Sequence, residues 1–166
     1  LYPDAEVISR ELASAGIDWH AYFNTFIVQD ERIFSEASAG NHFVKNEKGA
    51  PYLFDGVTFK PTGLADLSRA ETREWVKGYL RQGLDVGFKG WMADFAEWLP
   101  PDTRLNDMDP ILDHNLYPVL WQELSYEVLE DRDAVSFARS GWAGSHATTP
   151  IMWLGDQQTD WSVDDG

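Results

Sequence analysis

Four polar residues that could do chemistry each follow a short apolar stretch of the sequence: Asn24, Asp94, Arg139 and Asp156. In a parallel sheet or barrel, the carboxyl-terminal ends of the strands lie at one edge, and active sites gather there. If the apolar stretches are parallel strands, two carboxylates and an arginine therefore converge at that edge.

Two carboxylates beside an arginine are suited to glycoside hydrolysis. One carboxylate acts as nucleophile or base, and the other protonates the leaving oxygen. Because strand side chains alternate with a period of two, Asp94 shares a face with Met92 and Arg139 shares a face with Phe137. The alternative is structural: each aspartate caps a following helix or pairs with Arg139 for stability alone.

Aromatic side chains fall close to these charged residues. The chain has eight tryptophans among 166 residues. Flat rings of this kind stack on sugars and exclude water, although a well-packed core has the same composition. The tryptophans near the charges are Trp91, Trp98, Trp142, Trp153 and Trp161.

Composition argues against several other classes of function. Thirteen Lys and Arg against 28 Asp and Glu give a net charge of −15, which disfavours nucleic acid and anionic membrane surfaces as partners. The chain has no cysteine, which excludes disulfides, thiolate metal sites and cysteine nucleophiles. No apolar run has the length of a membrane span. The histidines lack paired metal-ligand spacing, so no metal and no cofactor are predicted.

The segments that would position the polar residues alternate between helical and extended patterns. Helices are expected over 3–15, 68–83 and 109–128, and strands over 17–24, 86–94, 134–139 and 151–156. Ser68 and Glu71 form a capping box, Gly83 ends the second helix, and Pro118 kinks the third helix or marks its true start. Strands that are apolar on both faces favour a parallel sheet covered by helices, so the predicted class is α/β.

Two connections are unusual in length. The segment 25–67 is too long for a bare connection, and its turn signals at 46–49 and 55–56 predict a small hairpin in a βα insertion on the catalytic face. Arg139 and Asp156 lie too close together in the sequence for a full helical crossover, so that βα unit should be degenerate.

Three longer motifs surround the polar residues: Gly90-Trp91-Met92-Ala93-Asp94-Phe95-Ala96-Glu97-Trp98-Leu99-Pro100, Phe137-Ala138-Arg139-Ser140-Gly141, and Trp153-Leu154-Gly155-Asp156-Gln157 with Asp160-Trp161-Ser162. These motifs resemble glycoside hydrolase family 31, and within it the sulfoquinovosidases, retaining α-glycosidases that release sulfoquinovose from its glycosides. The resemblance implies that residues 1–166 are the central part of a (β/α)8 TIM barrel, roughly strands three to six. The rest of the parent barrel would then be required for stability and activity.

The resemblance also implies roles for individual residues. Asp94 takes the nucleophile role and Asp156 the acid/base role, in a double displacement through a covalent glycosyl-Asp intermediate. Asp94 must be ionised, which Arg139 favours, and Asp156 must hold a proton, which burial near Trp153 favours. A retaining mechanism places the two carboxyl groups about 5–5.5 Å apart. The residues implied to bind substrate or support the site are Arg139, Glu97, Asn24, Trp91, Trp153, Gln157 and Trp161.

Two positions depart from the family pattern. Ala96 stands where glycine is expected, and Thr25 follows Asn24 where proline is common. The expected sulfonate-binding residues lie outside residues 1–166, so the sugar partner is either a sulfoquinovoside of glycerol or diacylglycerol, or an α-glucoside. The alternative functions are an α-glucosidase or α-xylosidase of the same family, or a carbohydrate-binding barrel without catalysis. A binding-only barrel would have no need to keep both carboxylates and the arginine.

Overall fold

The computed structural model describes residues 3–29, 31–55, 60–156, 159–161 and 163 of the chain. Its main sheet has four strands: β1 (Ala21–Asn24), β4 (Gly90–Asp94), β5 (Val135–Ala138) and β6 (Ile151–Met152). The strands lie in the order in which they occur along the chain, and each pairs in parallel with the next.

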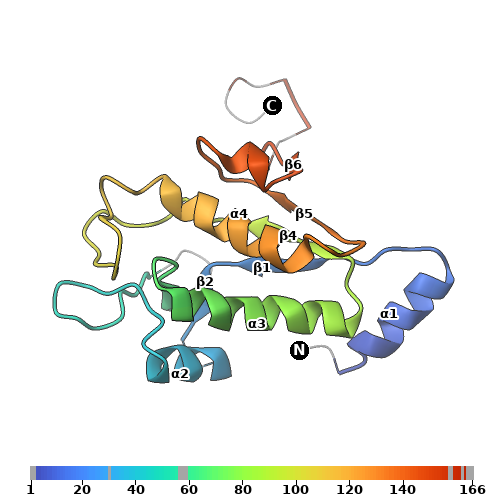
Figure 1. Cartoon of the computed structure of the whole chain (residues 1–166), viewed down its shortest axis with the longest axis horizontal. Coiled ribbons are helices and arrows are strands. Elements are labelled where there is room, and N and C mark those ends of the chain that lie inside the picture. The colour runs from blue at the N-terminus through green and yellow to red at the C-terminus, as the bar shows by residue number, and fades with distance from the viewer. Residues whose placement is uncertain (1–2, 30, 56–59, 157–158, 162, 164–166) are drawn as a thin grey trace.

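Two helices connect these strands and cover the sheet. Helix α3 (Ala70–Val86) precedes β4, and α4 (Leu116–Leu129) lies between β4 and β5 in the sequence. The two helices pack side by side (Figure 1). Right-handed crossovers between sequential parallel strands place every helix on the same outer side, as in the wall of a (β/α)8 barrel. The predicted α/β class, with part of such a barrel, is confirmed.

The core between sheet and helices fixes the position of β4. Its largest fully buried side chains include Trp91 of β4 and Trp121 and Tyr117 of α4. The Trp91 indole donates a hydrogen bond to the Ser125 hydroxyl (3.0 Å), which joins β4 to α4. Each such large buried side chain contributes about 1.5–3 kcal/mol by leaving water. The residue at the end of β4 is therefore held by a packed layer.

The start of α3 differs from the predicted capping box. Arg69 is the N-cap residue and no side chain caps this end of the helix. The Ser68 hydroxyl instead donates to the Asp66 carboxylate (2.5 Å), whose other oxygen accepts the backbone N–H of Asn106 (3.0 Å). The serine serves a loop junction because a local Asx-type bond competes with capping.

The end of α3 also lies beyond the predicted position. Gly83 is inside the helix, where a Cβ would meet the Phe23 ring at 3.2 Å, so glycine there permits close packing against β1. The helix ends at Val86, and Gly87 takes a left-handed φ of 104°, the usual geometry of a glycine after a helix. The strand predicted over 86–94 accordingly begins later, at Gly90.

The other predicted elements are present with changed bounds. The first helix is α1 (Ala5–Ser14), followed by Gly16 at φ 72°. Helix α4 begins at Leu116, so Pro118 lies near its true start and does not kink it. The strand predicted over 151–156 is the two-residue β6, and only a short 3-10 helix, η1 (Ser145–Ala147), links it to β5. No helix in the described ranges is both long and apolar enough to span a membrane.

The long segment after β1 forms a small subdomain. Strands β2 (Phe26–Val28) and β3 (Thr62–Leu64) pair antiparallel, and α2 (Arg32–Ala39) lies between them in the sequence. Part of the predicted turn at 55–56 falls at Gly56, outside the described residues. The centre of the Phe26 ring lies 5.0 Å from that of Phe95 and 5.8 Å from that of Trp98. This segment therefore touches the loop that follows β4.

Candidate active site

Three strand ends bring polar residues together at one edge of the parallel sheet. In the register between β1 and β4, Asn24 lies opposite Asp94. Ala93 of β4 lies opposite Ala138 of β5, which places Arg139 beside Asp94. The convergence follows from parallel pairing, because strands in register end at the same level.

Asp94 is the buried carboxylate of this edge. Its residue is only 5% exposed, although carboxylates are rarely buried without partners. The Tyr22 hydroxyl donates to its Oδ2 at 2.6 Å. Its Oδ1 lies 3.5 Å from Nε of Arg139 but accepts no hydrogen bond from any residue that the structure describes. One oxygen is therefore held, and the other faces a cation.

Arg139 is fixed by Glu97 and an aromatic ring. Its Nε donates to Oε1 of Glu97 at 2.8 Å, and its Nη2 donates to the same oxygen. The guanidinium carbon lies 4.0 Å from the centre of the Phe95 ring. Burial acts to lower the pKa of Arg139, but the Glu97 hydrogen bond and the Glu97 and Asp94 charges outweigh it, so the pKa is raised. Arg139 is thus a permanent positive charge beside Asp94.

Tyr22 is a site residue that the sequence interpretation missed. Burial, followed by the hydrogen bond to Asp94, raises the pKa of Tyr22 to about 12, despite opposing effects of Asn24 and Arg139. The hydroxyl therefore remains a donor at neutral and moderately alkaline pH. The signal was present: Tyr22 shares a strand face with Asn24, and Asn24 is the residue opposite Asp94.

The chain turns sharply after Asp94. Phe95 and Ala96 both have positive φ angles, of 60° and 84°, which non-glycine residues seldom adopt. The Ser140 hydroxyl donates to the Phe95 carbonyl and so ties this turn to the end of β5. The left-handed backbone explains why glycine is expected where Ala96 stands. Strained residues of this kind cluster at functional sites, and the turn brings Glu97 back to Arg139.

Asp156 does not have the predicted surroundings. It is exposed, whereas burial near Trp153 was expected, because β6 lies at the end of the sheet and pairs only with β5 in the described part of the chain. Its separation from Asp94 stays a prediction. Gln157 lies outside the described residues.

The tryptophans predicted near the charges differ widely in burial. Trp91 is fully buried on the helix side of β4, where its indole donates to Ser125 of α4, so it packs behind the strand that carries Asp94, and its predicted supporting role stays a prediction. Strand alternation explains this placement, since neighbours in a strand face opposite ways. Trp161 is fully exposed, and the half-buried Trp153 lines a cavity next to Arg139.

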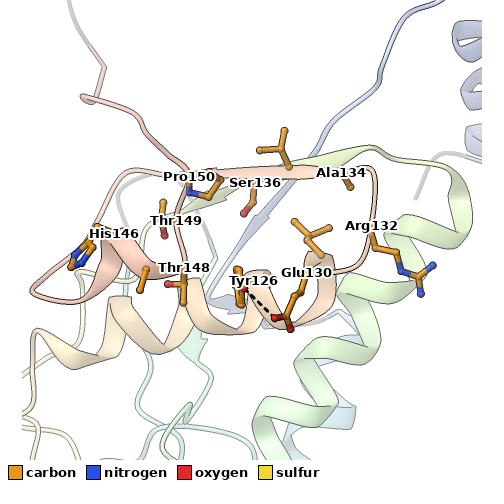
Figure 2. Close-up of a pocket in the computed structure, with 12 residues that line it drawn as sticks. Tyr126, Glu130, Arg132, Ala134, Ser136, His146, Thr148, Thr149 and Pro150 are labelled. Atoms are coloured by element: carbon orange, nitrogen blue, oxygen red, sulfur yellow. Dashed lines mark hydrogen bonds between the residues drawn. The ribbon is translucent and has the colours of Figure 1, made fainter.

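Two cavities lie next to β5 or the residues that follow it. One, of about 570 Å³, opens beside Arg139 and Glu97, with Trp153 in its wall. The other, of about 330 Å³, lies between α4 and β5 (Figure 2) and includes Tyr126, whose hydroxyl donates to Glu130 (3.1 Å). The second cavity is on the helix side of the sheet, away from the strand-end charges. In the described ranges, no three His, Cys, Asp or Glu side chains gather as a metal site.

Known proteins are similar to this chain in sequence and in fold. The model of the glycosyl hydrolases family 31 TIM-barrel domain matches residues 1–163. A sulfoquinovosidase of Escherichia coli (strain K12) is 34% identical over 99% of this chain and 25% of its own length. An α-xylosidase of Emericella nidulans is 25% identical over 94% of this chain and 20% of its own length. A solved GH31 family sulfoquinovosidase from E. rectale, in complex with an aza-sugar inhibitor, has a TM-score of 0.93 and 35% identity, covering 99% of this chain and 26% of that chain.

These likenesses cover nearly the whole chain and include the segments that hold Asp94 and Arg139. The chain spans about a quarter of the length of the E. coli relative. Since the family match runs from residue 1 to residue 163, the chain belongs to glycosyl hydrolase family 31.

Proposed function

We propose that this chain carries the nucleophile and the acid/base of a retaining α-glycosidase that hydrolyses α-sulfoquinovosides. The observation that carries the proposal is the buried carboxylate of Asp94 at the end of β4, with Tyr22 on one oxygen and Arg139 facing the other. Family membership supports cleavage of a glycosidic bond. The sulfoquinovosidases among the similar proteins support the sulfonated sugar.

Asp94 acts as the nucleophile in this proposal. An electron pair of its ionised carboxylate forms a bond to the anomeric carbon, and the bond to the leaving oxygen breaks. That oxygen keeps the bonding pair and takes a proton from Asp156. Water then attacks the anomeric carbon, gives a proton back to Asp156 and releases Asp94 as a carboxylate, so that the anomeric configuration is retained.

The contacts of Arg139 favour catalysis over a purely structural ion pair. A structural arginine–carboxylate pair is commonly bidentate, with two parallel hydrogen bonds. Arg139 instead directs its hydrogen bonds to Glu97 and approaches Asp94 only at 3.5 Å. Its charge thus favours the ionised nucleophile without a hydrogen bond that attack would have to break.

The acid/base role of Asp156 rests on its position after β6, in the Gly155-Asp156 motif. Asp156 is exposed in this chain, and the chain spans a quarter of the E. coli relative. We therefore propose that activity belongs to the full-length protein, whose remaining segments would cover Asp156 and complete the sugar site.

The proposal is tested by assaying the full-length protein with an aryl α-sulfoquinovoside and an aryl α-glucoside side by side. Asp94→Asn and Asp156→Asn should each abolish turnover of the sulfonated substrate. Asp133→Asn is the matched control, because Asp133 is fully exposed and contacts only Lys89 in the described ranges, remote from the strand-end charges. Proton NMR of the first sugar released should show the α-anomer. Release of the β-anomer, or full activity in Asp94→Asn, would contradict the proposal.

A second candidate is an α-xylosidase or α-glucosidase, which the similarity to the Emericella α-xylosidase favours. The same assay with an aryl α-xyloside separates the two. Preference for a neutral glycoside keeps Asp94 as nucleophile and removes the sulfonated substrate. Binding of sugar without turnover of any substrate would leave a non-catalytic barrel.

A further inference from the structure

The two carboxylate oxygens of Asp94 have different surroundings. Oδ2 accepts a hydrogen bond of 2.6 Å from the Tyr22 hydroxyl. Oδ1 is buried, lies 3.5 Å from Nε of Arg139 and accepts no hydrogen bond from the described residues. Rotating the carboxylate to exchange its oxygens would break a short hydrogen bond to a charged group, which is among the strongest kinds in proteins.

We propose, on the basis of the function above, that Tyr22 is a positioning residue for the nucleophile. It holds Oδ2, so that Oδ1 is the oxygen that bonds to the anomeric carbon. Both groups stand on adjacent strands in fixed register, where Tyr22 lies opposite Met92 and Asn24 lies opposite Asp94. Side chains on paired strands are held more firmly than side chains on loops, which suits a positioning role.

The hydrogen bond from Tyr22 affects the two chemical steps differently. In the first step Oδ1 donates its electron pair to the anomeric carbon, the carboxylate becomes an ester, and Oδ2 becomes a weaker acceptor. In the second step the bond between Oδ1 and the anomeric carbon breaks, and the pair returns to the carboxylate. Tyr22 stabilises this returning charge, so it favours the second step over the first.

The surroundings of Tyr22 keep it a donor during catalysis. Its pKa is raised to about 12, first by burial and then by the Asp94 hydrogen bond. The amide of Asn24 lies 3.4 Å from the hydroxyl oxygen and points its N–H at it. The charged group that faces the Tyr22–Asp94 pair is Arg139, the residue after β5. Arg139 in turn binds Glu97 from the loop after β4.

The experiment compares full-length wild type with Tyr22→Phe, using an aryl α-sulfoquinovoside with a good leaving group. With such a substrate the second step limits turnover. We expect kcat to fall about ten- to hundred-fold, the usual effect of losing a hydrogen bond to a charged group. KM should fall as well, because the covalent intermediate accumulates, and a burst of aryl alcohol equal to the enzyme concentration should precede steady turnover.

The matched control is Tyr126→Phe, which removes another tyrosine hydroxyl that donates to a carboxylate, on the helix side of the sheet (Figure 2). It should leave kcat, KM and the size of the burst as they are in wild type. A folded Tyr22→Phe enzyme with wild-type kcat and KM overturns the inference, and so does a fall in kcat with unchanged KM and no burst. If Asp94→Asn retains activity in the same assay, the proposed nucleophile fails, and the positioning role fails with it.

Discussion

Replacing Gly90 with alanine tests whether strand packing sets the geometry at Asp94. Gly90 begins β4 with a φ of 126°, a conformation that L side chains rarely adopt. A Cβ at this position would lie 1.7 Å from the carbonyl oxygen of Val135 in β5. Backbone strain costs about 1–3 kcal/mol and overpacking about 1–3 kcal/mol more. The free energy of unfolding should therefore fall by about 2–6 kcal/mol.

The same substitution should reduce activity. Val135 stands in the strand that leads to Arg139, so separating β4 from β5 at Gly90 moves Arg139 away from Asp94. A displacement of about 1 Å at a reacting group costs on the order of a hundredfold in rate. We expect kcat/KM to fall by that factor in protein that is still folded.

The measurement is denaturant unfolding of the full-length protein, followed by kcat/KM under conditions where both proteins are folded. Gly78→Ala is the control, because Gly78 lies inside α3 and a Cβ there would meet nothing within 4 Å. That change should raise stability by about 0.5–1 kcal/mol and leave kcat/KM unchanged. A Gly90→Ala protein as stable and as active as wild type would refute the reasoning.

Three further predictions separate catalytic from structural groups. Trp91→Phe should lower the free energy of unfolding by about 1–3 kcal/mol, because the Ser125 hydroxyl loses its buried hydrogen-bond partner. KM should stay the same, and a changed KM would indicate that Trp91 contacts the sugar. Arg139→Gln should lower kcat/KM at least a hundredfold, because the cation that lies 3.5 Å from Oδ1 of Asp94 is lost; an unchanged kcat/KM would contradict this. Ultraviolet titration should find a tyrosine with a pKa of about 12 that is missing in Tyr22→Phe. The pKa of Tyr22 lies above the ordinary 10.0, so its contribution to the free energy of unfolding is complete below pH 10 and is lost as the pH rises through 12. A Tyr22 hydroxyl that titrates at its ordinary pKa would contradict this prediction.

The local sequence was enough to predict most elements of the sheet. The stretches around β4 and β5 are short, apolar and bounded by polar residues, so their type could be read from the pattern; β4 ends at Asp94 as predicted, and β5 ends at Ala138, one residue earlier than predicted. The end of α3 could not, because Gly83 and Gly87 are equally good helix terminators in the sequence. The packing of Phe23 against Gly83 decides between them, and that contact is tertiary.

Strand alternation explains how several side chains are arranged around Asp94. The alternation of side chains places Tyr22 on the same strand face as Asn24, the residue opposite Asp94. It also places Trp91 on the other face of β4, against α4. Asp156 was harder to place, since it follows β6, a two-residue strand that pairs only with β5 in the described part of the chain.

The turn at Ala96 shows what a sequence pattern conceals. Alanine in this position suggests an ordinary backbone, yet the structure has a left-handed φ of 84° with the side chain buried. Only the resemblance to a family with glycine there indicated the unusual conformation. The strain is retained because Ser140 and the Arg139–Glu97 pair hold the loop from both sides.

The central claim is that Asp94 forms a covalent bond to the sugar. The direct test treats the full-length protein with a fluorinated glycosyl fluoride of sulfoquinovose, which slows the second step, and then identifies the labelled peptide by mass spectrometry. We expect one sugar per protein on the peptide containing Asp94, with no label on the Asp94→Asn protein. A label on another carboxylate, or an active enzyme that forms no covalent adduct and releases the inverted sugar, would contradict it.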